Sequence, residues 1–294
     1  MTGETKTYVV TGSASGMGAQ VATRLRADGH RVIGVDLHGA EVQADLSTPQ
    51  GRAEALAEVT AALTGPLDGM VLAAGLGPGK DRERMIVEVN LLGAIELLEG
   101  LRPALAAAGS AKVVVFGSNS TTSTPLVPRR ILTLLARRDT AGAARLIRLY
   151  GPLGGAIAYA TSKIAVSRWC RRAAVTAEWA GAGIGLNLIA PGPVLTPLLK
   201  SQLDGQTGKQ VRSFPVPARR YGTVEQLADW TLMMLSPAAD FMVGSVVTVD
   251  GGTEALLRPD AWPSPLPLRA MPRMLWTMYQ APKKGQVADY SAQD

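Results

Sequence analysis

The chain of 294 residues has very little cysteine and no long apolar run. Its single cysteine, Cys170, excludes an internal disulfide framework and is typical of a protein of the reducing cytoplasm. No apolar stretch approaches the roughly 18 residues that cross a membrane, and none follows the polar first residues as a signal peptide would. We therefore expect a cytoplasmic protein with no segment inserted in a membrane.

Charge of one sign is concentrated in one part of the chain. The protein has 30 basic and 24 acidic residues, a net charge of +6. Between residues 119 and 155 a single acid, Asp139, accompanies six arginines: Arg129, Arg130, Arg137, Arg138, Arg145 and Arg148. A nucleic-acid-binding protein would show a broader basic footprint. The sequence therefore predicts a local basic element and no nucleic-acid partner.

Short apolar runs alternate with helix-like segments along most of the chain. We expect strands at 8–11, 32–35, 70–73, 113–116, 185–189 and 246–249, and helices at 16–28, 49–63, 85–107, 159–180 and 224–235. Strands that are almost continuously apolar are typical of a parallel sheet covered on both faces. The alternation predicts an α/β fold with helices on both sides of such a sheet.

Two segments interrupt this alternation. Residues 119–155 have the apolar spacing of two short amphipathic helices, the second capped by Asp139, with arginines on the wet side. Residues 259–294 hold six prolines together with Trp262, Trp276 and several methionines. Disordered tails rarely carry so many large apolar groups, so we expect part of this extension to dock on its own or a partner subunit. The remaining chain, 1–258, is predicted to be one domain.

A glycine-rich turn joins the first predicted strand to the first helix. Gly12 allows a tight turn, Gly16 lets the backbone approach a pyrophosphate, and Gly18 permits close packing of the helix. An ordinary structural turn explains the glycines equally well. Asp36, however, ends the next strand, where a carboxylate accepts both adenosine ribose hydroxyls. Positions 37 and 38 hold no lysine or arginine that could bind a 2′-phosphate, so the sequence predicts NAD rather than NADP.

A second group of residues has the chemistry of an acid/base site. Tyr159 and Lys163 lie one helical turn apart on one face, and a nearby fixed cation lowers the pKa of a phenol. The same spacing also suits an ordinary amphipathic helix. Ser118 follows a predicted strand and emerges at the carboxyl edge of the sheet, where ligands bind. Asn90 lies in an apolar helical segment, either for function or as a satisfied structural amide.

Taken in order, these motifs resemble the short-chain dehydrogenase/reductase family over about residues 6–258. The set comprises Thr11-Gly12-xxx-Gly16-x-Gly18, Asp36, Asp45, Ala73-Ala74-Gly75, Asn90, Ser118, Tyr159-xxx-Lys163 and Pro191-Gly192. The resemblance implies a three-layer Rossmann fold with a seven-stranded parallel sheet. It also implies hydride transfer between NAD and an alcohol or ketone carbon, with a catalytic tetrad of Asn90, Ser118, Tyr159 and Lys163. No metal site is predicted.

The resemblance also implies where the cofactor binds. The family's positions fall here on Gly12, Ser13, Ser15, Gly16, Met17, Gly18, Asp36, Leu37, Asp45, Leu46, Ala74, Gly75, Tyr159, Lys163, Pro191, Gly192, Val194 and Thr196. Asp45 would meet the adenine and Thr196 the carboxamide. Lys163 would bind the nicotinamide ribose, and Asn90 would hold a water that relays protons to it. Ala73 stands where the family usually has asparagine, which leaves only backbone roles at that position.

The long spacing between Ser118 and Tyr159 points to one group within this family. With its flanking motifs, this insertion is similar to the bacterial 3-alpha-hydroxysteroid dehydrogenase/carbonyl reductases, which implies a hydroxysteroid or another bulky apolar carbonyl as substrate. Four leucines, Leu195, Leu198, Leu199 and Leu203, either form an apolar lid or merely pack their loop. We expect a homodimer or homotetramer, paired through the last helix and strand because the insertion either covers or remodels the face near Tyr159.

Three other functions remain open on the sequence. If the pocket takes substrates smaller than a steroid, the chain would be an oxoacyl or small-ketone reductase. A non-catalytic NAD-binding sensor would keep the nucleotide site, although a sensor is free to lose Tyr159 or Lys163 and this chain keeps all four tetrad positions. The basic insertion and the Trp/Met-rich extension would suit peripheral attachment to a membrane surface, and a solvated basic face explains the insertion equally well.

Overall fold

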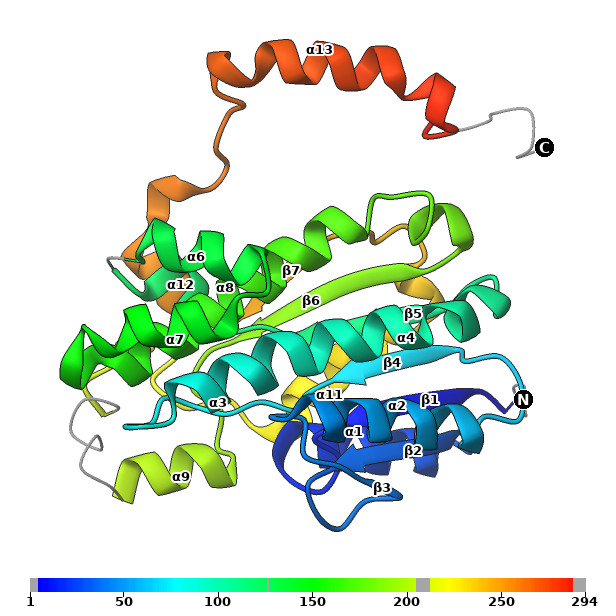
Figure 1. Ribbon diagram of the computed structural model, residues 1–294, viewed down its shortest axis with the longest axis horizontal. Coiled ribbons are helices and arrows are strands. Elements are labelled where there is room, and N and C mark those ends of the chain that lie inside the picture. Colours follow the sequence, from blue (N-terminus) through cyan, green and yellow to red (C-terminus); the bar gives the residue numbers. More distant parts are fainter. Residues whose placement is uncertain (1–4, 126, 205–211, 288–294) are drawn as a thin grey trace.

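A single parallel sheet forms the centre of the molecule (Figure 1). In this computed structural model, which describes residues 5–125, 127–204 and 212–287, the strand order is β3-β2-β1-β4-β5-β6-β7. The strands are β1 (Thr7–Thr11), β2 (Arg31–Asp36), β3 (Val42–Gln43), β4 (Gly69–Leu72), β5 (Lys112–Phe116), β6 (Gly185–Pro191) and β7 (Val246–Val249). The predicted seven-stranded α/β fold is confirmed. The two-residue β3 has no counterpart among the predicted strands because it is too short to show a pattern.

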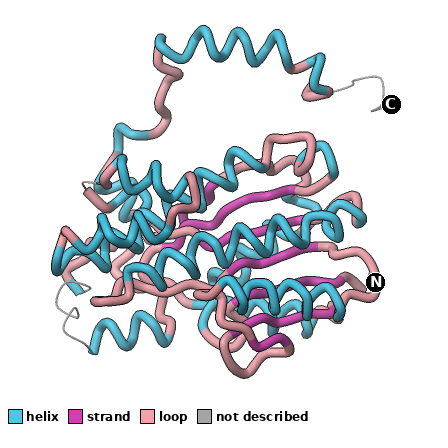
Figure 2. The backbone as a smooth tube through the Cα atoms, in the orientation of Figure 1, coloured by secondary structure: helices cyan, strands magenta, loops and turns pink. Residues whose placement is uncertain are grey.

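Helices cover both faces of the sheet (Figure 2). On one face lie α2 (Pro49–Ala62), α4 (Gly93–Ala107) and α8 (Gly154–Ala173), and on the other α1 (Gly16–Ala27) and α11 (Val224–Leu235). Successive side chains of a strand point to opposite faces. In β5, Val113 therefore packs on the side of α2, α4 and α8, and Val114 on the side of α1 and α11. Burying each such side chain contributes about 1.5–3 kcal/mol.

Two predicted helices differ from the observed ones. The segment 85–107 is divided into α3 (Glu83–Val87), a π-helical turn η1 (Glu88–Leu92) and α4. The helix carrying Tyr159 ends at Ala173, several residues before the predicted 180. Here the Thr176 hydroxyl donates to the Ala173 carbonyl, and the chain turns so that Trp179 is buried edge-on against Trp169.

The insertion before α8 folds back onto the domain. It contains α5 (Ser120–Ser123), α6 (Arg129–Ala136) and α7 (Thr140–Arg148). Asp139 caps α7, since its Oδ1 accepts the Gly142 N–H at 2.8 Å. Ile131 and Ile147 are fully buried, whereas the insertion's arginines are exposed. The amphipathic pattern therefore places α6 and α7 as a cover over α8 and α3.

The extension after α12 (Thr253–Leu257) stands apart from these layers. Figure 1 shows α13 (Met271–Gln280) running clear of the domain. Its Trp276 is 62% exposed, and Gln286 Nε2 donates to the Val175 carbonyl on the body. None of the described residues after 258 lines the pocket at the sheet edge of the same subunit, and docking on a partner subunit stays a prediction. Among the described helices, none combines the length and apolarity needed to cross a membrane.

The cysteine lies in the core on α8. Cys170 has no exposed surface, and it packs with Val166 and Trp179 in the layer on that side of the sheet. Burial raises the pKa of its thiol, because an apolar surrounding disfavours the thiolate. The side chain therefore acts as a small apolar group of the core.

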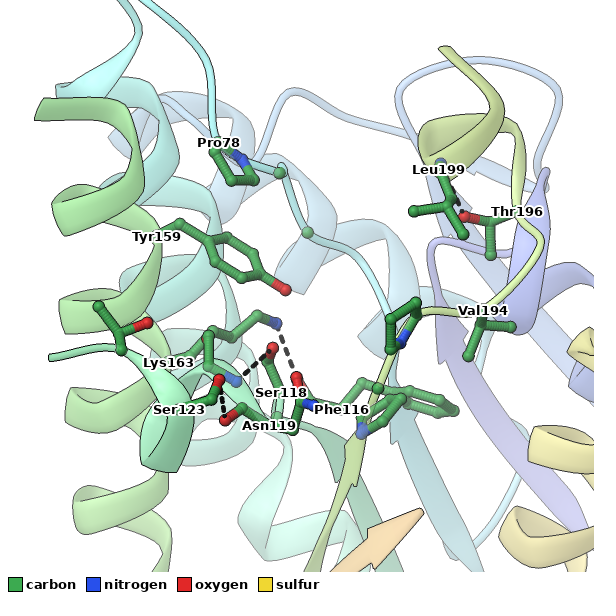
Figure 3. A pocket seen from close by; sticks show the side chains of 18 of the residues that line it. Pro78, Phe116, Ser118, Asn119, Ser123, Tyr159, Lys163, Val194, Thr196 and Leu199 are labelled. Carbon is green, nitrogen blue, oxygen red and sulfur yellow. Dashed lines mark hydrogen bonds between the residues drawn. The ribbon is translucent and has the colours of Figure 1, made fainter. Parts of the chain in front are cut away.

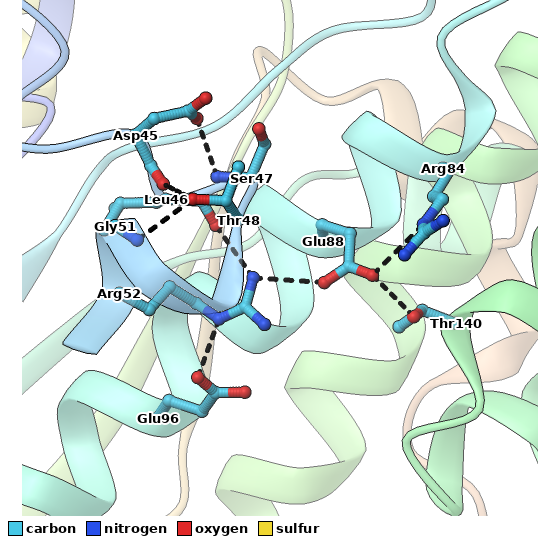
Figure 4. Close-up of polar contacts among 10 residues, drawn as sticks. All are labelled: Asp45, Leu46, Ser47, Thr48, Gly51, Arg52, Arg84, Glu88, Glu96 and Thr140. Atoms are coloured by element: carbon cyan, nitrogen blue, oxygen red, sulfur yellow. Dashed lines mark hydrogen bonds and ion pairs between the residues drawn. The ribbon is translucent and has the colours of Figure 1, made fainter.

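A buried ion pair ties α2 to the π-helical turn (Figure 4). Arg52 Nη1 donates to Glu88 Oε2 at 3.1 Å and to the Leu46 carbonyl at 3.1 Å, while its Nε donates to Glu96 at 2.7 Å. The Thr140 hydroxyl donates to the other oxygen of Glu88 at 2.6 Å. The Arg52–Glu88 pair therefore joins three stretches of the chain: residues 46–52, residues 84–96 and Thr140 of the insertion.

We expect Arg52→Met to destabilise the protein by about 3 kcal/mol, because the buried Glu88 carboxylate then keeps only the exposed Arg84, 3.6 Å away, as its cation. Chemical denaturation followed by circular dichroism measures this loss. Arg24→Met is the matched control, since Arg24 pairs with Asp229 at the surface and such pairs contribute at most about 1 kcal/mol. Equal losses in the two variants would contradict the structural importance of the buried pair.

Candidate active site

A pocket of about 440 Å³ opens at the carboxyl edge of the sheet (Figure 3). Parallel strands end together at this edge, so residues distant in sequence meet there. Its walls come from the loops after β1, β4, β5 and β6, from α8 and from the start of α9 (Pro197–Asp204). Of the predicted site residues, Met17, Gly75, Ser118, Tyr159, Lys163, Pro191, Gly192, Val194 and Thr196 line it.

Lys163 is anchored at the base of this pocket. It is 6% exposed, and its Nζ donates to the Phe116 carbonyl at the end of β5, 2.8 Å away. Burial lowers the pKa of this ammonium to about 8, because the charged form is poorly solvated there. The contact fixes α8 against the strand that leads to Ser118.

Tyr159 points from the same face of α8 into the pocket, above Ser118 (Figure 3). Burial raises the pKa of its phenol, and a hydrogen bond with Ser118 offsets this rise only in part. The predicted lowering of the pKa by Lys163 is therefore wrong for the protein by itself. Desolvation is the largest influence on the phenol, and the Lys163 ammonium donates to the Phe116 carbonyl. At neutral pH Tyr159 accordingly holds its proton.

Asn90 lies immediately behind the pocket in the π-helical turn. Its Oδ1 accepts the Leu76 N–H at 2.8 Å, while its Nδ2 donates to the Leu76 carbonyl and to Ser162 Oγ. A β-carbon on Gly75 would come within 3.2 Å of Asn90 Oδ1 and 3.4 Å of Lys163 Nζ. Asn90 is thus both a satisfied structural amide and a neighbour of Lys163. Single π turns are frequent at functional sites.

The glycine-rich turn lies across the sheet edge from α8. Gly12 has φ +70°, and a β-carbon there would lie 2.7 Å from the Ala74 N, so the turn requires glycine. A β-carbon on Gly18 would collide with the Gly12 carbonyl at 2.2 Å, which explains the close start of α1. Gly16, with φ +59°, faces Thr196 across a narrow gap. The buried Ser13 hydroxyl has no hydrogen-bond partner among the described residues.

Asp36 lies beside this turn at the end of β2. Its two carboxylate oxygens accept the N–H groups of Ala14, at 2.9 Å, and of Leu37, at 2.7 Å. A carboxylate has about four lone-pair positions, so two remain for a ligand. Asp45 is exposed further along the same edge, whereas the side chain of its neighbour Leu46 is buried.

Sequence reasoning missed much of the apolar wall of the pocket. Pro78, Pro125, Ala156 and Phe214 line it, together with Leu199 from the predicted lid. The other lid leucines do not: Leu195 and Leu203 lie outside the lining, and the side chain of Leu198 is not described. Ser120 also lines the pocket, and its buried hydroxyl lacks a partner among the described residues. Its position two residues after Ser118 was the one sequence signal that could have placed Ser120 in the pocket.

Known proteins of similar sequence were found for most of the chain. A family model described as short chain dehydrogenase matches residues 6–127, and one described as enoyl-(acyl carrier protein) reductase matches residues 143–254. A 3-alpha-hydroxysteroid dehydrogenase/carbonyl reductase of Comamonas testosteroni is 37% identical over 85% of this chain and 97% of its own. A coniferyl-alcohol dehydrogenase of a Pseudomonas species is 31% identical over 84% and 96%.

A solved structure extends this similarity to the arrangement of the chain. The 3-alpha-hydroxysteroid dehydrogenase of Pseudomonas sp. B-0831, complexed with NADH, has a TM-score of 0.81 and 38% identity, covering 87% of this chain and 99% of its own. The sequence match therefore spans the sheet, the glycine-rich turn and the segment that carries Tyr159 and Lys163. On this evidence the chain belongs to the short-chain dehydrogenase/reductase family.

Proposed function

We propose that this protein is an NAD(H)-dependent oxidoreductase that interconverts a secondary alcohol and a ketone on a bulky apolar, hydroxysteroid-like molecule. The observation that carries the proposal is the meeting of the Tyr159 phenol and the Ser118 hydroxyl inside an apolar pocket. Relatives named for this chemistry, one of them complexed with NADH, support it.

The chain's own residues fit the dinucleotide at the glycine-rich turn. The N-terminus of α1 has no acidic residue in its first turn and no side-chain cap, so its N–H groups remain for a pyrophosphate. Asp36 would accept the adenosine ribose hydroxyls and repel a 2′-phosphate, which favours NAD. When bound, NAD(H) accepts or supplies the hydride.

In the reduction direction Tyr159 would donate a proton to the substrate oxygen. Its raised pKa keeps the phenol protonated at neutral pH, so the proton is available at the position where the substrate oxygen would bind. Ser118 would hold the same substrate oxygen by a hydrogen bond. Lys163, next to Asn90, would bind the nicotinamide ribose and return a proton to Tyr159 from solvent. Each group acts from a position fixed by the sheet edge.

The substrate class follows from the pocket walls. Prolines, Phe214 and Leu199 line the pocket with Tyr159, and its volume of about 440 Å³ would be shared by the substrate and the nicotinamide end of the cofactor. An apolar ring system would displace water from these walls, which is the favourable term for such a ligand. The free Ser120 hydroxyl supplies one polar contact away from the reacting oxygen.

The subunits would pair through the last helix and the last strand. β7 is an edge strand, and α11 exposes Trp230 and Met233 beside it. Phe241, in the connection between them, is fully exposed. The opposite candidate face, on α8, is covered by α6 and α7 of the insertion. Apolar groups left in water on α11 and β7 therefore favour a dimer there.

Replacing the acid/base tests the reaction itself. We expect Tyr159→Phe to lower the turnover of a ketone by about 10²–10⁴-fold, the usual contribution of a positioned proton donor. NADH consumption with a panel of steroid and small ketones measures this, and NADH affinity should stay within about twofold of the wild type. Tyr150→Phe, at an exposed tyrosine of the insertion, is the control. No turnover in the wild type with any ketone would favour the sensor alternative.

Cofactor preference tests the role of Asp36. We expect Asp36→Ala to weaken NAD binding about tenfold, the effect of losing one charged hydrogen-bonding group. NADP binding should improve relative to NAD, because the repulsion of its phosphate is removed. Competition titrations measure both affinities, and Asp229→Ala, on α11, matches the loss of charge. An unchanged ratio of the two affinities in Asp36→Ala would refute the assignment.

The buried ammonium also predicts a pH-dependent stability. Lys163 has a folded-state pKa of about 8, below its ordinary value, so burial penalises its charged form in full below that pH. As pH rises from about 8 toward 10.5, the folded protein loses the proton first and the penalty disappears. The free energy of unfolding, relative to Lys163→Met, should rise by about 2 kcal/mol between pH 7 and 10. A flat difference would contradict the burial of the ammonium.

A further inference from the structure

A second cavity lies on the side of α8 that faces away from the active site. Its volume is about 590 Å³, within the usual range for ligand pockets, and it shares no lining residue with the pocket at the sheet edge. Arg168, in its wall, follows Tyr159 by nine positions, about two and a half turns of helix, which puts the two on opposite sides of α8. α4, α6 and α8 form its walls, and Figure 1 shows α6 lying over α8.

The floor of this cavity is apolar. Leu91, Ile95, Leu132 and Ile164 are buried at its base, and the half-buried ring of Trp169 joins them. Such a floor gives a ligand a favourable apolar contact but no polar partner. The ligand's body must therefore be apolar.

The rim of the cavity is basic. Four arginines line the cavity, Arg129, Arg138, Arg168 and Arg172, and its described lining includes no aspartate or glutamate. Arg138 pairs with Glu99. The remaining three are exposed and have no carboxylate partner among the described residues.

The placement of two of these arginines is unfavourable without a counter-ion. Arg168 and Arg172 lie one turn apart on α8, and like charges at this spacing repel each other. Arg129 approaches the same cavity from α6. A guanidinium group cannot lose its proton to relieve the repulsion, so an anion bound between these arginines would be stabilised by all of them.

We propose that this groove, which we call the arginine groove, binds an amphipathic anion, a molecule with an apolar body and a carboxylate, sulfate or similar head. The apolar body lies on Leu132, Ile164 and Trp169. The head is held by Arg168 and Arg172, with Arg129 on the facing helix. Guanidinium groups bind such oxyanions through paired, charge-assisted hydrogen bonds.

Dodecanoate, below its micellar concentration, is the probe, titrated calorimetrically into the full-length protein. We expect it to bind at least tenfold more tightly than dodecanol, which has the same apolar chain without the charge. The double variant Arg168→Gln/Arg172→Gln should weaken dodecanoate binding at least tenfold. Arg171→Gln, at the exposed neighbour on α8 outside the cavity, should stay within about twofold of the wild type. Raising the salt concentration should weaken binding only where the arginines are present.

The folding control is the rate of ketone reduction without dodecanoate, which should be the same in the double variant and the wild type. Equal dodecanoate affinity in the double variant and the wild type would overturn the proposal. The proposal would also be overturned if dodecanoate competed with a ketone substrate and this competition persisted in the double variant. The probe would then occupy the active site. Loss of the oligomer in the double variant, seen by sedimentation velocity without the probe, would show instead that a second copy covers the groove.

Discussion

The buried ion pair between Arg52 and Glu88 holds together the parts of the chain that build the site. Glu88 begins the π-helical turn that carries Asn90, and Arg52 also binds the Leu46 carbonyl in the loop after β3. Thr140 brings the insertion to the same carboxylate. Burying two charges is costly unless their hydrogen-bonding positions are filled. Here they are filled from three stretches of the chain, so each stretch has one favourable position relative to the others.

The fold could be predicted from the sequence because its signals are local. The apolar runs of β1, β4 and β5 are continuous, that of β7 is interrupted only by Thr248, and Thr48 caps α2 as its place before Pro49 indicates. The π turn could not be predicted, since Asn90 and its neighbours have the apolar spacing of an ordinary helix. The end of α8 at Ala173 depends on Trp179 entering the core, which is a tertiary contact.

The site could be predicted only as a set of residues. Spacing and order identified Ser118, Tyr159 and Lys163, which the structure brings to one pocket. Spacing says nothing about solvent, and so the pKa of Tyr159 was predicted in the wrong direction. Phe214 and Pro78 reach the pocket from loops distant in sequence, and no local pattern marks them. The two faces of α8 also differ in solvent exposure, which spacing does not predict. Lys163 is desolvated on one face, whereas Arg168 and Arg172 remain in water on the other.

The burial of Cys170 has a practical consequence for work on this protein. A protonated thiol inside the core reacts neither with alkylating reagents nor with peroxide, because both need an accessible thiolate. The chain has no other cysteine. Thiol labelling therefore reports the opening of the core around α8, and the native protein already carries the probe with which the rate of that opening is measured.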